Sequence, residues 1–108
     1  MMALCAYYEG TPADPAAFDR HVEDVHLPLV ARYPRLRALR YIKGMPRDGV
    51  APKYYLSFEL FFDSAEDFQV AAGSEERDRA VRDAAALNAG FDGEIHHVMY
   101  EVSEIPIG

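Results

Sequence analysis

The sequence predicts an α+β domain whose elements follow the order β-α-β-β-α-β. Three observations support this prediction: a period-two strand pattern near residue 58, helical spacing of apolar residues after Pro15, and a second helical segment after Ser74. The chain has 108 residues, half of them hydrophobic, which is enough for one buried core. This order of elements is that of a ferredoxin-like fold, with a four-stranded antiparallel sheet and helices on one face. We therefore expect a single domain over residues 1–108.

The first helix is expected to begin at Pro15 and end at Tyr33. Asp14 is a suitable N-cap, and Pro15 fits the first helical position because its missing N–H has no helical partner there. Pro28 lies inside the apolar pattern and cannot donate a hydrogen bond to the carbonyl of Asp24. We therefore expect the helix to kink or restart near this residue.

Four strands are expected, over residues 3–9, 36–43, 54–62 and 95–104. The second and third are joined by residues 44–53, which are rich in glycine and proline and therefore predict a loop.

The second helical region is expected in two segments separated by Gly73. Ser64 caps the first segment, with Asp67 three residues later, and Ser74 caps the second, which runs to about Leu87. Asp83 is expected on the surface of this helix or as a capping residue.

Strand alternation predicts that Leu56, Phe58 and Leu60 face the helices. The opposite face then carries a large apolar patch, which is unusual on a soluble monomer, so we expect a second copy to cover it in a two-fold homodimer. The alternative is an aromatic surface that a monomer tolerates. The side chains expected on this face are Tyr7, Leu39, Tyr41, Tyr55, Glu59, Phe61, His97, Met99 and Glu101.

Charge and cysteine content exclude several classes of protein. The chain has 18 acidic and 11 basic residues and a net charge of −7, which argues against binding to nucleic acid or to an anionic membrane. The single cysteine, Cys5, cannot form an intrachain disulfide, and the N-terminus lacks the basic start of a secretory signal. No apolar run approaches the roughly 18 residues of a membrane span. We expect a cytoplasmic protein.

His26 is the strongest candidate for chemistry. At about 100° per residue it falls at the edge of the apolar stripe of the first helix, beside the kink expected at Pro28. A partly buried imidazole titrates near neutrality, as proton transfer at pH 7 requires. The alternative is a structural histidine whose ring binds a carbonyl that the kink leaves free.

The other histidines do not predict a metal site. His21 lies five residues before His26 and does not share its face as an i, i+4 pair would, so we expect it in solvent. His96 and His97 are neighbours in a strand and point to opposite faces, so they cannot chelate one ion together. Without a recognisable metal spacing or a glycine-rich phosphate loop, we expect neither a metal nor a cofactor.

Tyrosines that flank a cavity near His26 would orient a substrate enol or phenol. We assign Tyr55 a catalytic role beside His26, in which its hydroxyl stabilises an enolate oxygen. For Glu59 the alternative is a salt bridge with a basic residue of the neighbouring strand. The side chains assigned to substrate binding are Tyr7, Tyr41, Glu59 and His97.

Segments along nearly the whole chain match one family pattern. They are Tyr7-Tyr8, the turn Thr11–Pro15, Phe18, the run HVEDVHLPLV around His26, Tyr33–Leu36, Tyr54–Leu56, Phe62–Ser64, and the alanine-rich helix with Asp83 before Phe91. Together they resemble the EthD family of dimeric α+β-barrel proteins. His26 matches the histidine of the family motif directly. The resemblance implies a ferredoxin-like protomer whose sheet forms a barrel with that of a second copy.

The resemblance also implies small-molecule chemistry. EthD is associated with bacterial ether breakdown beside a cytochrome monooxygenase system, and the wider superfamily includes cofactor-free oxygenases, polyketide cyclases, dehydratases and lactone isomerases. We therefore expect a cofactor-free enzyme of degradation or secondary metabolism, using His26 for acid–base chemistry on a hydrophobic aromatic or polyketide-like substrate. The alternative is a non-catalytic dimeric carrier that delivers a hydrophobic metabolite to an oxidase system.

Overall fold

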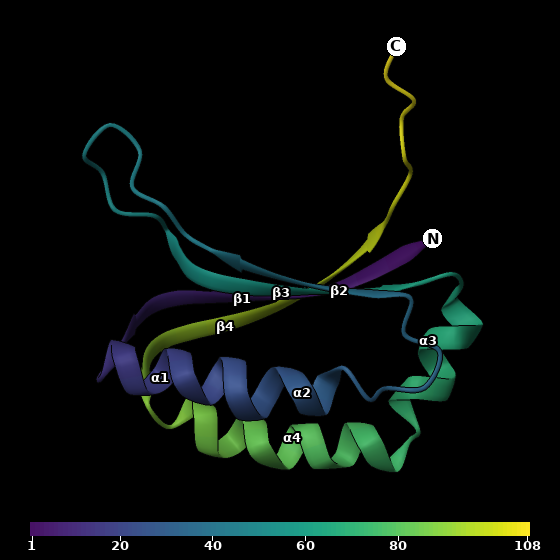
Figure 1. Cartoon of the computed structure of the whole chain (residues 1–108), viewed down its shortest axis with the longest axis horizontal. Coiled ribbons are helices and arrows are strands. Elements are labelled where there is room, and N and C mark those ends of the chain that lie inside the picture. The colour runs from purple at the N-terminus through teal and green to yellow at the C-terminus, as the bar shows by residue number, and fades with distance from the viewer.

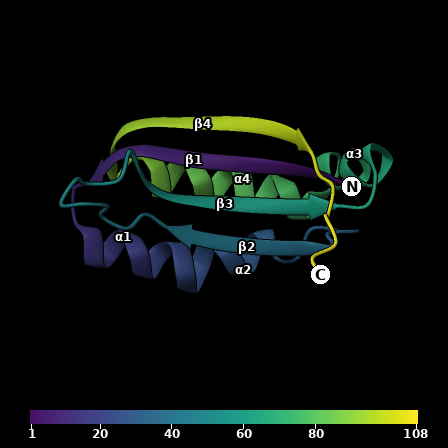
Figure 2. The same cartoon turned by 90° about the horizontal axis from the view of Figure 1, so that it is seen from above.

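All helices of the chain lie on one side of a four-stranded antiparallel sheet (Figure 1). The computed structural model describes residues 1–108. Its strands are β1 (Met2–Pro12), β2 (Ala38–Lys43), β3 (Tyr54–Phe62) and β4 (Phe91–Glu101), and its helical segments are α1 (Pro15–His21), the π-helical turn η1 (Val22–His26), α2 (Leu27–Val30), α3 (Ala65–Ala72) and α4 (Glu75–Asn88). The strand order across the sheet is β2-β3-β1-β4 (Figure 2). The predicted α+β ferredoxin-like fold is confirmed.

Three predicted caps begin the helices. The carboxylate of Asp14 accepts from the N–H of Ala17 at 3.2 Å. The hydroxyl of Ser64 accepts from the N–H of Asp67 at 3.1 Å, and Ser74 does the same for the N–H of Arg77 at 3.2 Å. Each cap satisfies an N–H that the first helical turn leaves without a partner. None of the helices combines the length and the apolar character needed to span a membrane.

The kink expected near Pro28 takes the form of the π-helical turn η1. The N–H of Leu27 donates to the carbonyl of Val22, five residues back. Pro28 has no N–H for the Asp24 carbonyl, so the α-helical hydrogen bond that would oppose this widening is missing. The helix ends at Val30 in α2, three residues earlier than the sequence predicts.

The main core lies between the sheet and the helices. Phe62 and Leu56 of β3 and Leu87 of α4 are among its most deeply buried side chains. Aromatic rings pack edge to face at its centre, with the Tyr8 and Phe91 centroids 5.1 Å apart. Phe18 of α1 packs against both rings, so this cluster joins α1 to β1 and β4.

A β-bulge in β3 changes which tyrosine faces the helices. Tyr8 pairs with Leu56, but Glu9 pairs with Tyr54, so Tyr55 is an extra residue without a partner on β1. As a result Tyr55 points toward the helices, contrary to the prediction from strict alternation. Tyr54 lies on the face of the sheet away from the helices, here called the open face.

The sequence also predicts the wrong orientation for β2 and β4. Tyr41 pairs with Phe58 and His97 pairs with Ala6, and directly paired residues share a face. Because Phe58 and Ala6 belong to the helix-side core, their partners face the helices as well. The residues predicted on the open face but found on the helix face are Leu39, Tyr41, Tyr55, His97, Met99 and Glu101.

The open face nevertheless remains rich in apolar and aromatic groups. Tyr7, Glu59 and Phe61 lie on it as predicted, and the register adds Ile42 and Tyr100, whose exposed fractions are 42% and 43%. The loop between β2 and β3 and the C-terminal segment extend from this same side of the sheet (Figure 1). The sheet therefore has one face covered by helices and one face that no helix covers.

Replacing Gly93 with alanine is expected to destabilise the fold by at least about 2 kcal/mol. Gly93 has φ +152°, and a Cβ there would lie 2.0 Å from the backbone oxygen of Glu9. Gly73→Ala is the matched control, because its Cβ would meet nothing closer than 3.7 Å. Urea unfolding followed by circular dichroism measures both variants, and equal stability of Gly93→Ala and wild type would contradict the prediction.

Candidate functional site

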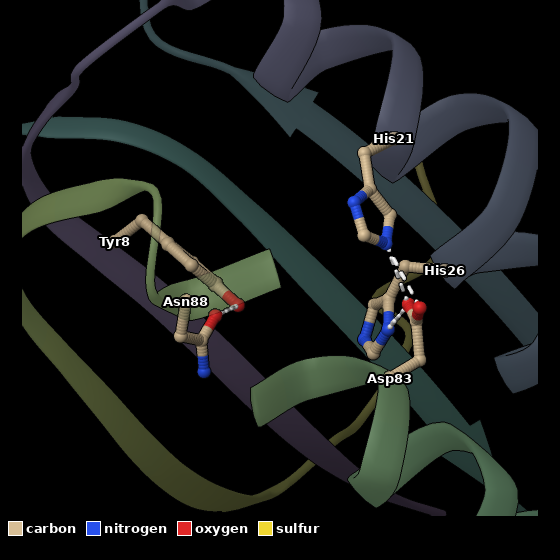
Figure 3. A network of polar contacts seen from close by, with 5 residues as sticks. All are labelled: Tyr8, His21, His26, Asp83 and Asn88. Carbon is tan, nitrogen blue, oxygen red and sulfur yellow. Dashed lines mark hydrogen bonds and ion pairs between the residues drawn. The ribbon is translucent and has the colours of Figure 1, made fainter. Parts of the chain in front are cut away.

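His26 lies at the end of η1, with 6% of its surface exposed, and is held by a carboxylate from α4. Its Nδ1 is 3.0 Å from Oδ2 of Asp83 (Figure 3). An ionised carboxylate can only accept, so the hydrogen of the neutral imidazole belongs on Nδ1. The unprotonated Nε2 therefore lies on the side of the ring away from Asp83, where it can accept a proton.

His21 binds the same carboxylate, which corrects the expectation that it lies in solvent. Its Nε2 is 2.8 Å from Oδ1 of Asp83, and 31% of its side chain is exposed. The expectation assumed α-helical spacing, in which residues five apart diverge. The π-helical turn between them brings His21 and His26 onto one face, so both rings meet Asp83 (Figure 3).

Burial lowers the pKa of His26 below its ordinary value of 6.5. The hydrogen bond and the negative charge of Asp83 oppose this effect and raise the pKa, but the desolvation is larger. His26 is therefore neutral at pH 7, with the lone pair of Nε2 free.

A cavity of about 330 Å³ borders His26 between the sheet and α4. On the α4 side its wall includes the small side chains of Ala80 and Ala84. Its size is within the range of small-molecule sites, and its walls are predominantly apolar. The lining residues not named elsewhere in this subsection are Leu4, Val30, Tyr33, Phe58, Leu60 and Val81.

A few polar groups also border the cavity. The hydroxyl of Tyr8 donates to Oδ1 of Asn88 at 2.6 Å, which leaves the amide N–H groups of Asn88 available (Figure 3). Burial raises the pKa of Tyr8 to about 12, so this phenol stays protonated at neutral pH. Arg77 and His97 complete the polar lining. The site thus combines one base with neutral donors and one cation.

The structure does not bring Tyr55 or Tyr41 to this cavity. The hydroxyl of Tyr55 donates to Oδ1 of Asp19 at 2.8 Å, and that of Tyr41 donates to Glu23 at 3.3 Å. Lys43 pairs with Asp19 at 2.9 Å, so these groups tie the sheet to α1 and η1. Burial raises the pKa of both phenols, to about 12 for Tyr55. In this structure they are fixed donors at the edge of the helix layer.

Tyr7 and Glu59 lie on the open face, away from His26. The hydroxyl of Tyr7 donates to that of Tyr100 at 3.0 Å, an interaction that raises the pKa of Tyr7. Glu59 makes no ion pair, because Lys43 binds Asp19 and Arg37 binds the side chain of Asp63 instead. Of the four side chains assigned to substrate binding, His97 alone borders the cavity.

Sequence reasoning missed four residues of this site. Asp83 was expected on the helix surface or as a capping residue, and Tyr8, Arg77 and Asn88 were assigned no role. The alternation of β1 does place Tyr8 on the helix face, two residues from Ala6. Asp83 and Asn88 meet their partners across 57 and 80 residues of sequence, a distance over which local spacing carries no signal.

Comparisons with known proteins agree with this architecture. The EthD domain model matches residues 11–89. An uncharacterised 11.0 kDa protein in the thcB-thcC intergenic region of Rhodococcus erythropolis is 37% identical over 79 residues, which are 73% of this chain and 77% of that protein.

Solved structures show the same fold. An ethyl tert-butyl ether degradation (EthD) family protein from Bacillus halodurans has a TM-score of 0.84 and 28% identity, over 95% of this chain and 99% of its own. A dimeric ferredoxin-like protein of unknown function from Thermobifida fusca has a TM-score of 0.68 and 15% identity, with coverage of 94% and 90%. SnoaB, a cofactor-independent oxygenase from Streptomyces nogalater, has a TM-score of 0.63 and 15% identity, with coverage of 96% and 93%.

The protein is a ferredoxin-like α+β protein, as its four-stranded sheet, single helix layer and strand order show. The imidazole of His26 borders its apolar cavity. The family model covers most of the chain, and the relative from Rhodococcus erythropolis is 37% identical over 73% of it. The chain belongs to the EthD family.

Acidification is expected to destabilise the protein through His26. Its folded pKa lies below the 6.5 of the unfolded chain, so its contribution to stability is fully present above pH 6.5 and is lost as the pH falls through the folded value. His26→Gln removes the group that takes up a proton on unfolding. The free energy of unfolding should then change less between pH 5 and pH 7, as measured by urea unfolding at a series of pH values. The control His97→Gln replaces an exposed histidine, and an unchanged slope in His26→Gln would contradict the prediction.

Proposed function

We propose that this protein is a homodimeric, cofactor-free enzyme that removes a proton from a hydrophobic substrate bound beside His26. One observation carries the proposal: Asp83 holds Nδ1 of a buried imidazole, and this histidine lines an apolar cavity of about 330 Å³. A carboxylate in this position sets the tautomer and orientation of a histidine base.

The base acts on a carbon acid or a phenol. The C–H or O–H bond breaks, its electron pair stays on the substrate, and the proton binds Nε2 of His26. The resulting imidazolium is stabilised by the negative charge of Asp83, 3.0 Å from Nδ1. The oxyanion of the enolate or phenolate is stabilised by donors at the cavity wall, for which the amide of Asn88 and the guanidinium of Arg77 are positioned. His97 contributes a further polar contact to the substrate.

The apolar lining selects a hydrophobic substrate, and an aromatic ketone or polyketide-like molecule offers both the acidic proton and the oxygen. Oxygenation is the reaction favoured by the structural similarity to SnoaB. A deprotonated CH₂ group reacts with dioxygen so that one oxygen atom enters the carbon as a carbonyl. The other oxygen leaves as water with the two hydrogens of the CH₂ group, so no external reductant is required. Cyclisation, dehydration or isomerisation would begin with the same proton transfer.

Anthrone is a suitable probe, because it is hydrophobic and its CH₂ group is acidic. Without oxygen, the protein should catalyse exchange of these hydrogens in deuterated water, measured by NMR; in air it should form anthraquinone, measured by absorbance. His26→Gln and Asp83→Asn should slow the exchange, by about 100- to 10,000-fold for the loss of the base.

Asp78→Asn is the matched control, because it neutralises an exposed carboxylate on the same helix and should exchange at the wild-type rate. Wild-type exchange in His26→Gln would exclude His26 as the base. Stoichiometric binding of anthrone by calorimetry, with no exchange and no product, would favour the carrier function instead.

The homodimer follows from the open face. Similar folds are described as dimeric, and Ile42 and Tyr100 expose apolar surface on this side, away from the cavity. A second copy placing its own open face here would bury both sheets and form a barrel between the protomers.

Light scattering should therefore give a mass about twice the 12.1 kDa of one chain. Ile42→Lys should shift the population to monomer, because it places a charge in the interface. Val70→Lys is the control, since this exposed valine lies on α3 on the helix side of the molecule. A monomeric wild type at micromolar concentration would refute the dimer.

A further inference from the structure

A second cluster of chemically active side chains lies on β1 and the edge strand β4, on residues that the proposed chemistry does not use. Glu9 of β1 is directly opposite Glu94 of β4, and His96 is the next residue on the same face of β4. One ligating atom from each lies within 4.8 Å of the other two. The pairing of the two adjacent strands therefore brings two carboxylates and one imidazole close together.

The separations suit one small cation. Nε2 of His96 is 2.9 Å from Oε1 of Glu9 and 3.7 Å from Oε2 of Glu94. Ligands bonded to zinc at ordinary lengths in a tetrahedron are about 3.3 Å apart, and the two observed distances bracket this value. Small rotations of exposed side chains are enough to reach it, since Glu94 is 79% exposed and His96 40%.

The backbone at this place is held rigidly. Gly10 and Gly93 are directly paired beside the two glutamates, with φ +138° and +152°. A Cβ on either glycine would lie within about 2 Å of backbone oxygen on the opposite strand (2.2 Å at Gly10, 2.0 Å at Gly93). This close approach fixes the position of Glu9 relative to Glu94 in the two neighbouring residues.

The arrangement carries an electrostatic cost that a cation would remove. Like charges directly opposite on antiparallel strands repel each other. Lys53 is the basic residue bordering the adjoining hollow, but its ammonium lies 5.5 Å from the Tyr54 ring centroid and forms no ion pair with either glutamate. His96 is thus the group that bridges the two carboxylates, and it does so with a single nitrogen.

We propose that Glu9, Glu94 and His96 form a binding site for a divalent transition-metal ion such as Zn²⁺. An imidazole with two carboxylates suits zinc or manganese, whereas Ca²⁺ and Mg²⁺ prefer oxygen ligands alone. Three protein ligands leave a coordination position open toward a hollow of about 420 Å³ lined by Tyr7, Tyr54 and Tyr100. The site is separate from His26 and does not depend on the proposed acid–base chemistry. It lies on the open face, so the proposed dimer would enclose the hollow between the two sheets.

Titration of the purified protein with Zn²⁺ in a calorimeter tests the site. One Zn²⁺ should bind per chain, and His96→Asn and Glu94→Gln should each weaken binding at least about tenfold, since even outer-shell changes at metal sites cost that much. Mg²⁺ at the same concentration should not compete. Circular dichroism of each variant confirms that its fold is retained, and Glu94→Gln changes a side chain too exposed to affect folding.

His97→Asn is the matched control, because it removes the neighbouring histidine, which faces the opposite side of the sheet. Zinc binding that is lost in His96→Asn and Glu94→Gln but kept in His97→Asn supports the site. The proposal is overturned by an absence of zinc binding at 100 μM, by equal affinity in His96→Asn and wild type, or by loss of binding in His97→Asn alone.

Discussion

The candidate site depends on one hydrogen bond that the chain cannot make. Pro28 has no N–H for the carbonyl of Asp24, and the helix widens there into the π-helical turn η1. Because of that turn, His21 and His26 lie on one side and both reach Asp83 of α4. A regular α-helix would rotate the two rings apart, and Asp83 would then hold one of them at most. The π-helical turn thus lets both histidines bind α4 and sets the orientation of the His26 ring.

A second local irregularity decides how the tyrosines are shared between the two faces. The bulge at Tyr55 sends this residue to the helix layer, where it binds Asp19, and leaves Tyr54 on the open face. Under strict alternation Tyr55 would lie on the open face and Tyr54 on the helix face. Tyr55 would then lose its hydrogen bond to Asp19, and Tyr54 would lose its contact with Tyr7, whose ring centroid is 5.1 Å away. One extra residue therefore builds both the polar link between sheet and α1 and the aromatic lining of the open face.

The sequence predicts the element order, the three helix caps and the helix-facing side of Leu56, Phe58 and Leu60 in β3, because these depend on local spacing and on residues within a few positions of each other. It fails for β2 and β4, whose side chains mix polar and apolar types on both faces and whose orientation is set by pairing with β3 and β1. His26 could be predicted at the edge of the buried stripe, but not its partner Asp83, 57 residues away. The same limit hid the convergence of Glu9 with His96, which the pairing of β1 with β4 creates.

The balance of forces on His26 restricts the substrates that the proposed base can use. Desolvation exceeds the stabilisation from Asp83, so the imidazole is neutral at pH 7 but is a weaker base than in water. Such a base can remove a proton only from a carbon or oxygen that is already acidic, and the polar groups at the cavity wall must then stabilise the anion that forms. The apolar wall, which under the proposed function admits a hydrophobic substrate, also lowers the pKa of His26. The proposed substrate must therefore supply its own activation through a neighbouring carbonyl or aromatic ring.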